Sequence, residues 1–163
     1  MSREYPIIAV TGSSGAGTTT VRRSFERMFL REDVHAAMVD GDAFHRYTRD
    51  DLKRIFREEP ERKDELSHFA VEANLLDRLE GLFIEYGEHG TGTFRHYIHA
   101  EDKQKIEAGY RVGTFTEWQS LPCGTDLLFY EGLHGGLVTQ EYDIARHVDL
   151  LVGVAPTMNL EWI

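Results

Sequence analysis

The chain has 163 residues, is 41% hydrophobic and carries a formal net charge of −10 at pH 7. This length suits one domain with a hydrophobic core, and no apolar run is long enough to span a membrane. The acidic excess argues against broad binding to nucleic acid. One cysteine, Cys123, excludes an internal disulfide, and without a signal-like N-terminus we expect a cytoplasmic protein with no membrane partner.

Hydrophobic periodicity predicts strands that alternate with helices. Strands are expected at residues 5–10, 34–39, 126–132 and 148–154, the last of them buried, with short or irregular ones at 94–99 and 114–118. Helices are expected at 19–30, 49–59 and 69–86, with glycines 87, 90 and 92 breaking the last one, a helical turn at 142–146 and the start of a helix after residue 155. This alternation favours one parallel α/β sheet. The sequence stops within an apolar segment, so we expect a fragment.

A glycine-rich loop follows the first predicted strand and leads directly into the first helix. This order is typical of a phosphate-binding loop, in which glycines let successive N–H groups point at a polyphosphate. The ATP-binding residues predicted in this way are Gly12, Ser13, Ser14, Gly15, Ala16, Gly17, Thr18, Thr19 and Thr20. Thr19 falls where a Mg²⁺-binding hydroxyl belongs, but Thr18 replaces the usual lysine. A plain glycine-rich turn remains the alternative at this point.

Two carboxylates are expected at the carboxyl ends of strands, where open parallel sheets bind their ligands. Asp42 follows the second strand and is the predicted general base for phosphoryl transfer to an alcohol. Glu131 ends the apolar run 127–130 and would hold the metal ion together with Thr19. The alternatives are a turn-forming or helix-capping role for Asp42 and a solvated strand end for Glu131.

A local cluster of basic side chains follows Asp42 in this otherwise acidic sequence. His45, Arg49 and Lys53 would suit a phosphorylated acceptor, because two or three cations match one phosphate group; a solvated helix is the alternative. His134 follows Glu131 and either faces the pocket or stabilises the turn. The spacing of the other histidines matches no compact zinc pattern.

Four segments together closely resemble bacterial-type phosphoribulokinase. They are Gly12–Thr19, Asp40-Gly41-Asp42-Ala43-Phe44-His45-Arg46, Phe69-Ala70-Val71-Glu72-Ala73-Asn74 and Leu128-Phe129-Tyr130-Glu131-Gly132-Leu133-His134-Gly135. The resemblance implies a P-loop NTPase-like three-layer sandwich with a mostly parallel sheet, like that of nucleoside monophosphate kinases. It implies transfer of a phosphoryl group from ATP, with Mg²⁺, to the C1 hydroxyl of D-ribulose 5-phosphate. The product, ribulose 1,5-bisphosphate, feeds carbon fixation in the Calvin cycle. A threonine at position 18 is usual in this bacterial type.

The resemblance also assigns roles to individual residues. Asp42 would be the base, Glu131 the metal-associated acid, and His45 and Arg49 sugar-phosphate ligands. Tyr97 and His99 resemble the acceptor-binding segment of the related uridine kinases. The loop cysteine of the thiol-regulated plant type is absent here, so thioredoxin control is not expected.

Family members of this type are homo-oligomers that respond to NADH, for which no site is assigned here. They also continue past residue 163 into a lid and further strands. Residues 1–163 would therefore be the N-terminal part of a P-loop kinase domain, with poor or no turnover by itself. A uridine- or pantothenate-type kinase and a noncatalytic nucleotide-binding fragment remain as alternatives.

Overall fold

A sheet of four parallel strands forms the centre of the computed structural model, which describes residues 4–13, 15–63, 65–67 and 70–155. The strands are β1 (Ile7–Gly12), β2 (Ala36–Asp40), β5 (Leu127–Glu131) and β6 (Leu150–Val154), in the order β2-β5-β1-β6. The chain leaves β1 toward β2 on one side and reaches β6 on the other. Since all their carboxyl ends meet at one edge, the segments that follow them converge there.

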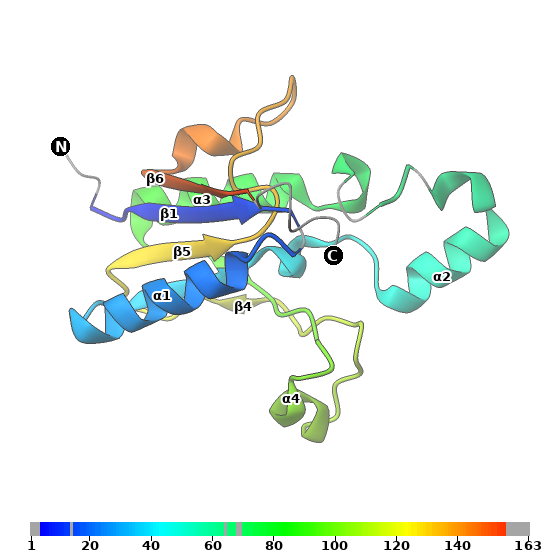
Figure 1. The fold of residues 1–163 in the computed structure, drawn as a ribbon, viewed down its shortest axis with the longest axis horizontal. Helices are drawn as coiled ribbons and strands as arrows, with labels where there is room; N and C mark the ends of the chain where they lie inside the picture. Colours follow the sequence, from blue (N-terminus) through cyan, green and yellow to red (C-terminus); the bar gives the residue numbers. More distant parts are fainter. Residues whose placement is uncertain (1–3, 14, 64, 68–69, 156–163) are drawn as a thin grey trace.

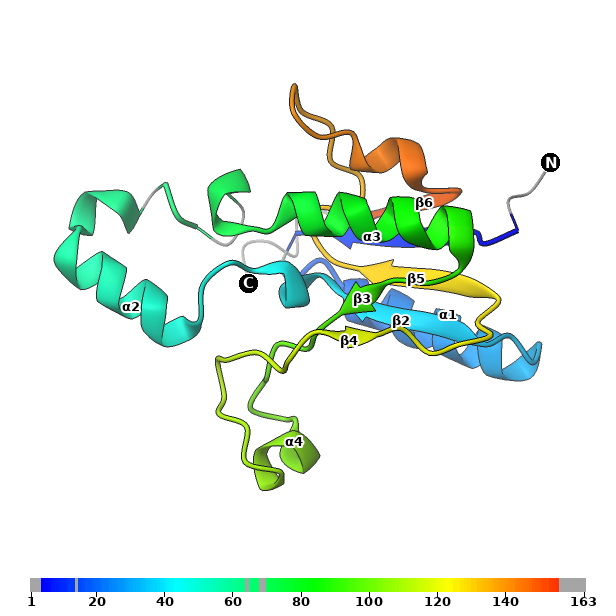
Figure 2. The same cartoon turned by 180° about the vertical axis from the view of Figure 1, so that it is seen from behind.

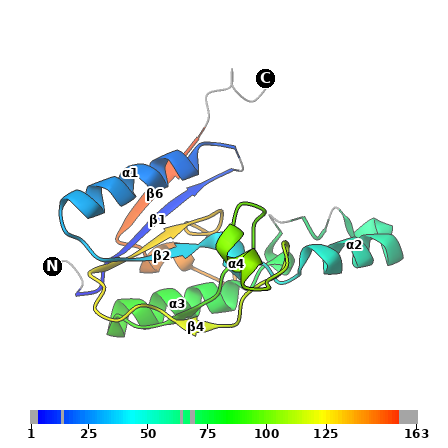
Figure 3. The ribbon, with the colours of Figure 1, turned by 90° about the horizontal axis from the view of Figure 1, so that it is seen from below.

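Helices cover both faces of this sheet, with α1 (Thr18–Arg31) on one side and α3 (Leu76–His89) on the other, as Figure 3 shows. Neighbouring residues of β5 point to opposite faces. The ring of Phe129 lies 5.1 Å from that of Phe25 in α1, measured between centroids, whereas the ring of Tyr130 lies 5.5 Å from that of Phe83 in α3. The predicted three-layer α/β architecture is therefore confirmed.

Two excursions leave these layers near the carboxyl edge of the sheet (Figures 1 and 2). One carries α2 (Arg49–Glu58). The other leaves the antiparallel pair β3 (Thr93–Phe94) and β4 (Gln119–Ser120) and carries the short helix α4 (Lys103–Glu107). Short 3₁₀ turns occupy Gly41–Phe44, Pro60–Lys63, Val71–Ala73 and Ile144–His147. None of the helices in the described ranges is both long and apolar enough to cross a bilayer.

The helix predicted at residues 69–86 is wrong at both ends. The described residues before α3 form a 3₁₀ turn and then extended backbone at Asn74, and α3 continues through Gly87 to His89. Tertiary hydrogen bonds explain the late start: Leu75 N–H donates to Phe44 O, and Arg46 N–H donates to Ala73 O. Gly90, in a left-handed conformation with φ 65°, ends the helix instead.

Several predicted strands and turns also differ from the structure. In place of the strand predicted at 94–99, the structure has the end of β3 and an isolated bridge between Tyr97 and Phe115. The range 114–118, also predicted as a strand, contributes only Phe115 to that bridge. The turn at 142–146 is a 3₁₀ turn one or two residues later. The prediction that the last strand is buried is wrong, because β6 is an edge of the described sheet and its residues Leu150 and Leu151 are each 46% exposed. The helix predicted after residue 155 lies outside the described residues.

Candidate active site

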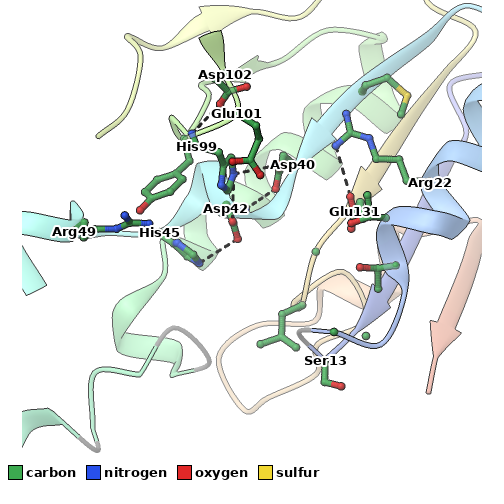
Figure 4. A pocket seen from close by; sticks show the side chains of 18 of the residues that line it. Ser13, Arg22, Asp40, Asp42, His45, Arg49, His99, Glu101, Asp102 and Glu131 are labelled. Carbon is green, nitrogen blue, oxygen red and sulfur yellow. Dashed lines mark hydrogen bonds and ion pairs between the residues drawn. The ribbon is translucent and has the colours of Figure 1, made fainter. Parts of the chain in front are cut away.

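A cleft of about 700 Å³ opens at the carboxyl edge of the sheet, where β1, β2 and β5 end. This size is within the range of small-molecule sites. Its lining combines the glycine loop, both excursions and the strand ends; Figure 4 shows most of these side chains. The lining residues are Gly12, Ser13, Gly15, Thr18, Thr19, Arg22, Met38, Asp40, Asp42, His45, Arg49, Tyr97, His99, Glu101, Asp102, Lys105, Glu131, Gly132 and Leu133.

The loop between β1 and α1 has the backbone of an anion-binding loop. Gly15 and Gly17 have φ values of 82° and 97°, which residues with a side chain rarely adopt. Gly17 is also the N-cap of α1. Because glycine brings no capping side chain, the first turn of α1 offers its N–H groups and the positive end of its dipole to a ligand beside Thr18 and Thr19.

The register of β2 on β5 brings two carboxylates side by side, since Asp40 is the strand partner of Glu131. A glycine follows each of them. A Cβ added to Gly41 would lie 2.6 Å from the Tyr130 hydroxyl and 2.8 Å from Gly132 Cα. A side chain at either of these two glycines would push the ends of β2 and β5 apart. The two carboxylates can therefore lie close together only because both following residues are glycines.

Asp42 lies between two imidazoles. Its Oδ1 is 3.6 Å from His45 Nε2, and its Oδ2 is 3.5 Å from His99 Nε2, which is also 4.0 Å from Asp40 Oδ2. The Asp42 N–H donates to Asp40 Oδ1 at 2.9 Å, so Asp40 orients the turn that carries Asp42. Burial, followed by the neighbouring charge of Asp42, raises the pKa of the Asp40 carboxyl. The two carboxylates and two imidazoles form one polar group that projects into the cleft (Figure 4).

Glu131 meets a cation from α1 on the other side of the cleft. Arg22 Nη1 lies 3.6 Å from Glu131 Oε2, and Arg22 Nε donates to Glu26 Oε1 at 3.0 Å. Burial works against the Arg22 charge, but the hydrogen bond to Glu26 and the charges of Asp40, Glu26 and Glu131 raise its pKa above the ordinary value. Arg22 therefore remains a cation in the cleft.

Arg95 holds the 3₁₀ turn at Gly41–Phe44 in place, although it does not itself line the cleft. Its Nε donates to Ala43 O at 2.8 Å and its Nη2 to His45 O at 2.6 Å. The guanidinium carbon lies 3.6 Å from the ring centroid of Phe115, in cation–π geometry. Burial, and secondarily the charge of Arg78, lowers the pKa of Arg95 to about 10. Arg95 thus ties the excursion after β3 to the segment that carries Asp42 and His45.

The structure gathers most of the predicted site residues in this one cleft. Lys53 is an exception: it does not line the cleft, is exposed, and its Nζ donates to Asp50 Oδ1 at 3.4 Å. His134 is buried in the turn after β5 and does not line the cleft either. Ala16, Gly17 and Thr20 belong to the loop and the start of α1 without lining the cleft. Ser14 lies outside the described residues.

Sequence reasoning missed several lining residues, because nothing in their local sequence marks them. Arg22 is one of several charged residues on an amphipathic helix. Glu101, Asp102 and Lys105 belong to the α4 excursion, a polar segment that reaches the cleft only through the tertiary fold. Of these missed residues, only Asp40 could have been predicted from the sequence, because it stands at the end of a predicted strand, two residues before Asp42.

The oxygen donors of the cleft fit a magnesium ion that is shared with a phosphate ligand. The Thr19 hydroxyl and the carboxylates of Asp40 and Glu131 face the same space. Within the described ranges, no three His, Cys, Asp or Glu side chains form a complete metal cage. Mg²⁺ commonly uses one or two carboxylates and takes its remaining ligands from water and substrate phosphates.

Comparison with known protein families identifies the family of this chain. The model of the phosphoribulokinase/uridine kinase family matches residues 7–163. The chain belongs to this family. It is 52% identical to a phosphoribulokinase of Nitrobacter vulgaris and 53% identical to the chromosomal phosphoribulokinase of Cupriavidus necator, with all of this chain and 56% of each relative aligned. The chain thus spans about half the length of these phosphoribulokinase/uridine kinase family members.

Solved structures of similar proteins share the fold. The phosphoribulokinase from Rhodobacter spheroides superposes with a TM-score of 0.83 at 45% identity, covering 99% of this chain and 55% of its own. A possible uridine kinase from Bacillus stearothermophilus reaches a TM-score of 0.64 at 13% identity, covering 99% of this chain and 76% of its own. The second likeness supports the fold alone.

Proposed function

We propose that the protein to which this chain belongs is an ATP-dependent kinase that phosphorylates the C1 hydroxyl of D-ribulose 5-phosphate. The observation that carries the proposal is the position of Asp42, which shares one cleft with the glycine loop and Glu131. A base for the acceptor hydroxyl and donors for the polyphosphate thus face the same space. Identity of about half the positions to relatives named phosphoribulokinase supports this acceptor.

In this proposal each group of the cleft has one task. The glycine loop and the first turn of α1 bind the polyphosphate through N–H groups. Thr19 and Glu131 hold Mg²⁺, and Asp42 accepts the proton of the acceptor hydroxyl. When bound, Mg·ATP supplies the phosphoryl group and the metal charge that offsets the developing negative charge.

The neighbours of Asp42 orient it and bind the acceptor. Arg49, His45, Tyr97 and His99 line the side of the cleft near Asp42 and would hold the sugar phosphate. The ring of Tyr97 packs edge-on against both His45 and His99, with centroids 6.0 Å and 5.0 Å away. This chain of rings limits how far either imidazole can move from Asp42. Lys53 is not included among the acceptor ligands, because its amine is engaged outside the cleft.

Other properties follow from the same family assignment and stay proposals. They are a P-loop kinase domain of which residues 1–163 form the N-terminal part, a cytoplasmic location, where ATP and sugar phosphates are available, and a role in carbon fixation. A homo-oligomeric state and a response to NADH are expected for the longer protein. Light scattering with and without NADH would test the last two properties.

The test is formation of ribulose 1,5-bisphosphate from ATP and ribulose 5-phosphate in the presence of Mg²⁺. It is run on the 163-residue chain, on a version extended to the length of the relatives, and on Asp42→Asn in both. Uridine and pantothenate are alternative acceptors, and Asp50→Asn, an exposed acid of α2 outside the cleft, is the matched control.

We expect turnover of ribulose 5-phosphate in the extended protein and little or none in the short chain. Asp42→Asn should lower kcat by about 10²- to 10⁴-fold, the range for losing a general base, while Asp50→Asn stays near wild type. Phosphorylation of uridine or pantothenate instead would replace the proposed acceptor. ATP binding without turnover in any form would leave a noncatalytic nucleotide-binding module.

A further inference from the structure

Arg22 is a cation in the cleft to which the motifs assign no task. Residues 11–21 contain no lysine, arginine or histidine, so the glycine loop brings no positive side chain of its own. Arg22 follows Thr18 by four positions and Thr19 by three, which places all three on one face of α1. Arg22 stands one helical turn after the place where the motif lacks its lysine. It lines the same cleft as Thr18 and Thr19, with its guanidinium turned toward Glu26.

The guanidinium of Arg22 has one firm partner and one loose partner. The bond from Nε to Glu26 Oε1, at 3.0 Å, has hydrogen-bond length and joins two residues of the same helix. The distance of 3.6 Å between Nη1 and Glu131 Oε2 is that of an ion pair without a hydrogen bond. Arg22 can leave Glu131 while Glu26 still holds it in the cleft.

We propose that Arg22 supplies to the nucleotide phosphates the positive charge that Thr18 cannot, and that Glu131 holds its guanidinium until a divalent metal ion takes that carboxylate. The inference rests on the proposed kinase function. A metal ion at Glu131 binds the carboxylate at a shorter distance than the guanidinium does and repels the guanidinium as a like charge. The released fork of N–H donors is well shaped for phosphate oxygens.

The other labelled basic side chains of the cleft are placed for a different task. Figure 4 shows Arg49, His45 and His99 grouped around Asp42, on the side away from Arg22 and Glu131. In the proposed function that side receives the acceptor. Lys105, which also lines the cleft, has its Nζ 3.9 Å from Asp102 Oδ1 on the α4 excursion. Arg22 is the cation that α1 itself brings to the cleft, and its charge is favoured by the three carboxylates of Glu26, Asp40 and Glu131.

The experiment measures two affinities that the proposal moves in opposite directions. Binding of Mn²⁺ alone is followed by electron paramagnetic resonance, and binding of Mg·ATP by calorimetry, on the 163-residue chain. The variants are Arg22→Gln, Arg22→Lys and the matched control Arg23→Gln. Arg23 is the exposed neighbour of Arg22 and does not line the cleft, so its variant removes the same charge from a different face.

For Arg22→Gln we expect Mn²⁺ to bind about two- to fivefold tighter. The metal ion no longer has to break the ion pair between Arg22 and Glu131, and an exposed ion pair is worth about this much. Mg·ATP should bind about ten- to a hundredfold weaker, since a charged hydrogen bond to phosphate is lost. Arg22→Lys should restore most of the nucleotide affinity, and Arg23→Gln should match wild type in both titrations.

Each other result overturns a stated part of the proposal. Weaker Mn²⁺ binding in Arg22→Gln would mean that the arginine organises Glu131 for the metal and does not compete with it. Unchanged Mg·ATP affinity would remove the phosphate role, while leaving the kinase proposal intact. Absence of Mg·ATP binding in the wild-type 163-residue chain would overturn this inference for the chain, and its absence in the extended version as well would overturn the proposed function.

Discussion

Asp42 is exposed to the cleft, and its setting comes from the residues around it. Asp40 accepts the Asp42 N–H, and His45 and His99 approach its two oxygens from different elements. Placing Asp40 so close has a cost, because burial and the charge of Asp42 disfavour its ionised form. The Asp40 carboxylate thus holds the turn that carries Asp42 in place, but it lowers the stability of the folded state.

We therefore expect Asp40→Asn to stabilise the fold at neutral pH, because asparagine still accepts the Asp42 N–H and carries no charge. A raised pKa means that the folded state binds more protons than the unfolded state, so wild-type stability falls as pH rises through the folded pKa. The Asp40→Asn variant does not lose stability in this way, because its side chain does not titrate. Its advantage in melting temperature should vanish near about pH 3, below the pKa of both the unfolded and the folded state, and appear toward about pH 8. A constant difference at all pH values would refute the assignment.

At the scale of elements, α2 depends on its own first turn, because it projects from the layers of the sheet (Figure 1). Thr48 is its N-cap and forms a capping box with Asp51: the Asp51 N–H donates to Thr48 Oγ1, and the Thr48 N–H donates to Asp51 Oδ2. The Thr48 hydroxyl, against the effect of burial, lowers the pKa of Asp51. The same helix begins with Arg49, which lines the cleft.

Thr48→Ala should loosen α2 without unfolding the sheet. Loss of such a cap costs about 1 kcal/mol, so amide hydrogen exchange within α2 should become about fivefold faster, while exchange in β1 and β5 stays unchanged. The lowered pKa of Asp51 stabilises the fold fully above the ordinary carboxyl value, and this contribution is lost as pH falls through the lowered pKa; the effect of Thr48→Ala should therefore shrink in acid. Thr48→Ser keeps the cap and should exchange like wild type. Equal acceleration in Thr48→Ser would point to a cause other than the cap.

At the scale of the whole molecule, β5 joins the layers, because its alternate side chains reach both helices. Phe129 packs against Phe25 and Phe29 of α1, with ring centroids 5.1 Å and 5.7 Å away. It is completely buried. Since β5 also ends in Glu131, the packing of this strand fixes one wall of the cleft.

Phe129→Ala should lower the free energy of unfolding by about 3–5 kcal/mol, as large-to-small changes in a core do. That is a large part of the about 5–15 kcal/mol that stabilises a typical domain. Urea denaturation followed by circular dichroism measures it. Leu30→Ala, on the exposed side of α1 with 85% exposure, is the control and should shift stability by no more than about 0.5 kcal/mol. Equal effects of the two changes would contradict the three-layer packing.

The sequence by itself determined the features that depend on local order. The order of strand, glycine loop and helix identified the loop at residues 12–20, since that conformation needs glycines within a few positions. Apolar runs located β1, β2 and β5, because a strand covered on both faces is apolar throughout. The same runs placed Asp42 and Glu131 at the carboxyl edge of the sheet, where the structure has its cleft, and the combined motifs indicated the family.

Only the tertiary structure decided what depends on partners distant in sequence. The start of α3 is set by hydrogen bonds from Leu75 and Arg46, which override a helical pattern. The exposure of β6 follows from its place in the strand order, which apolar composition does not encode. The pairing of Asp40 with Glu131, the approach of His99 to Asp42 and the contact of Arg22 with Glu131 likewise arise from register and layer packing. Periodicity reports which face of an element is apolar, whereas the partner of a charged side chain is chosen only when the elements pack.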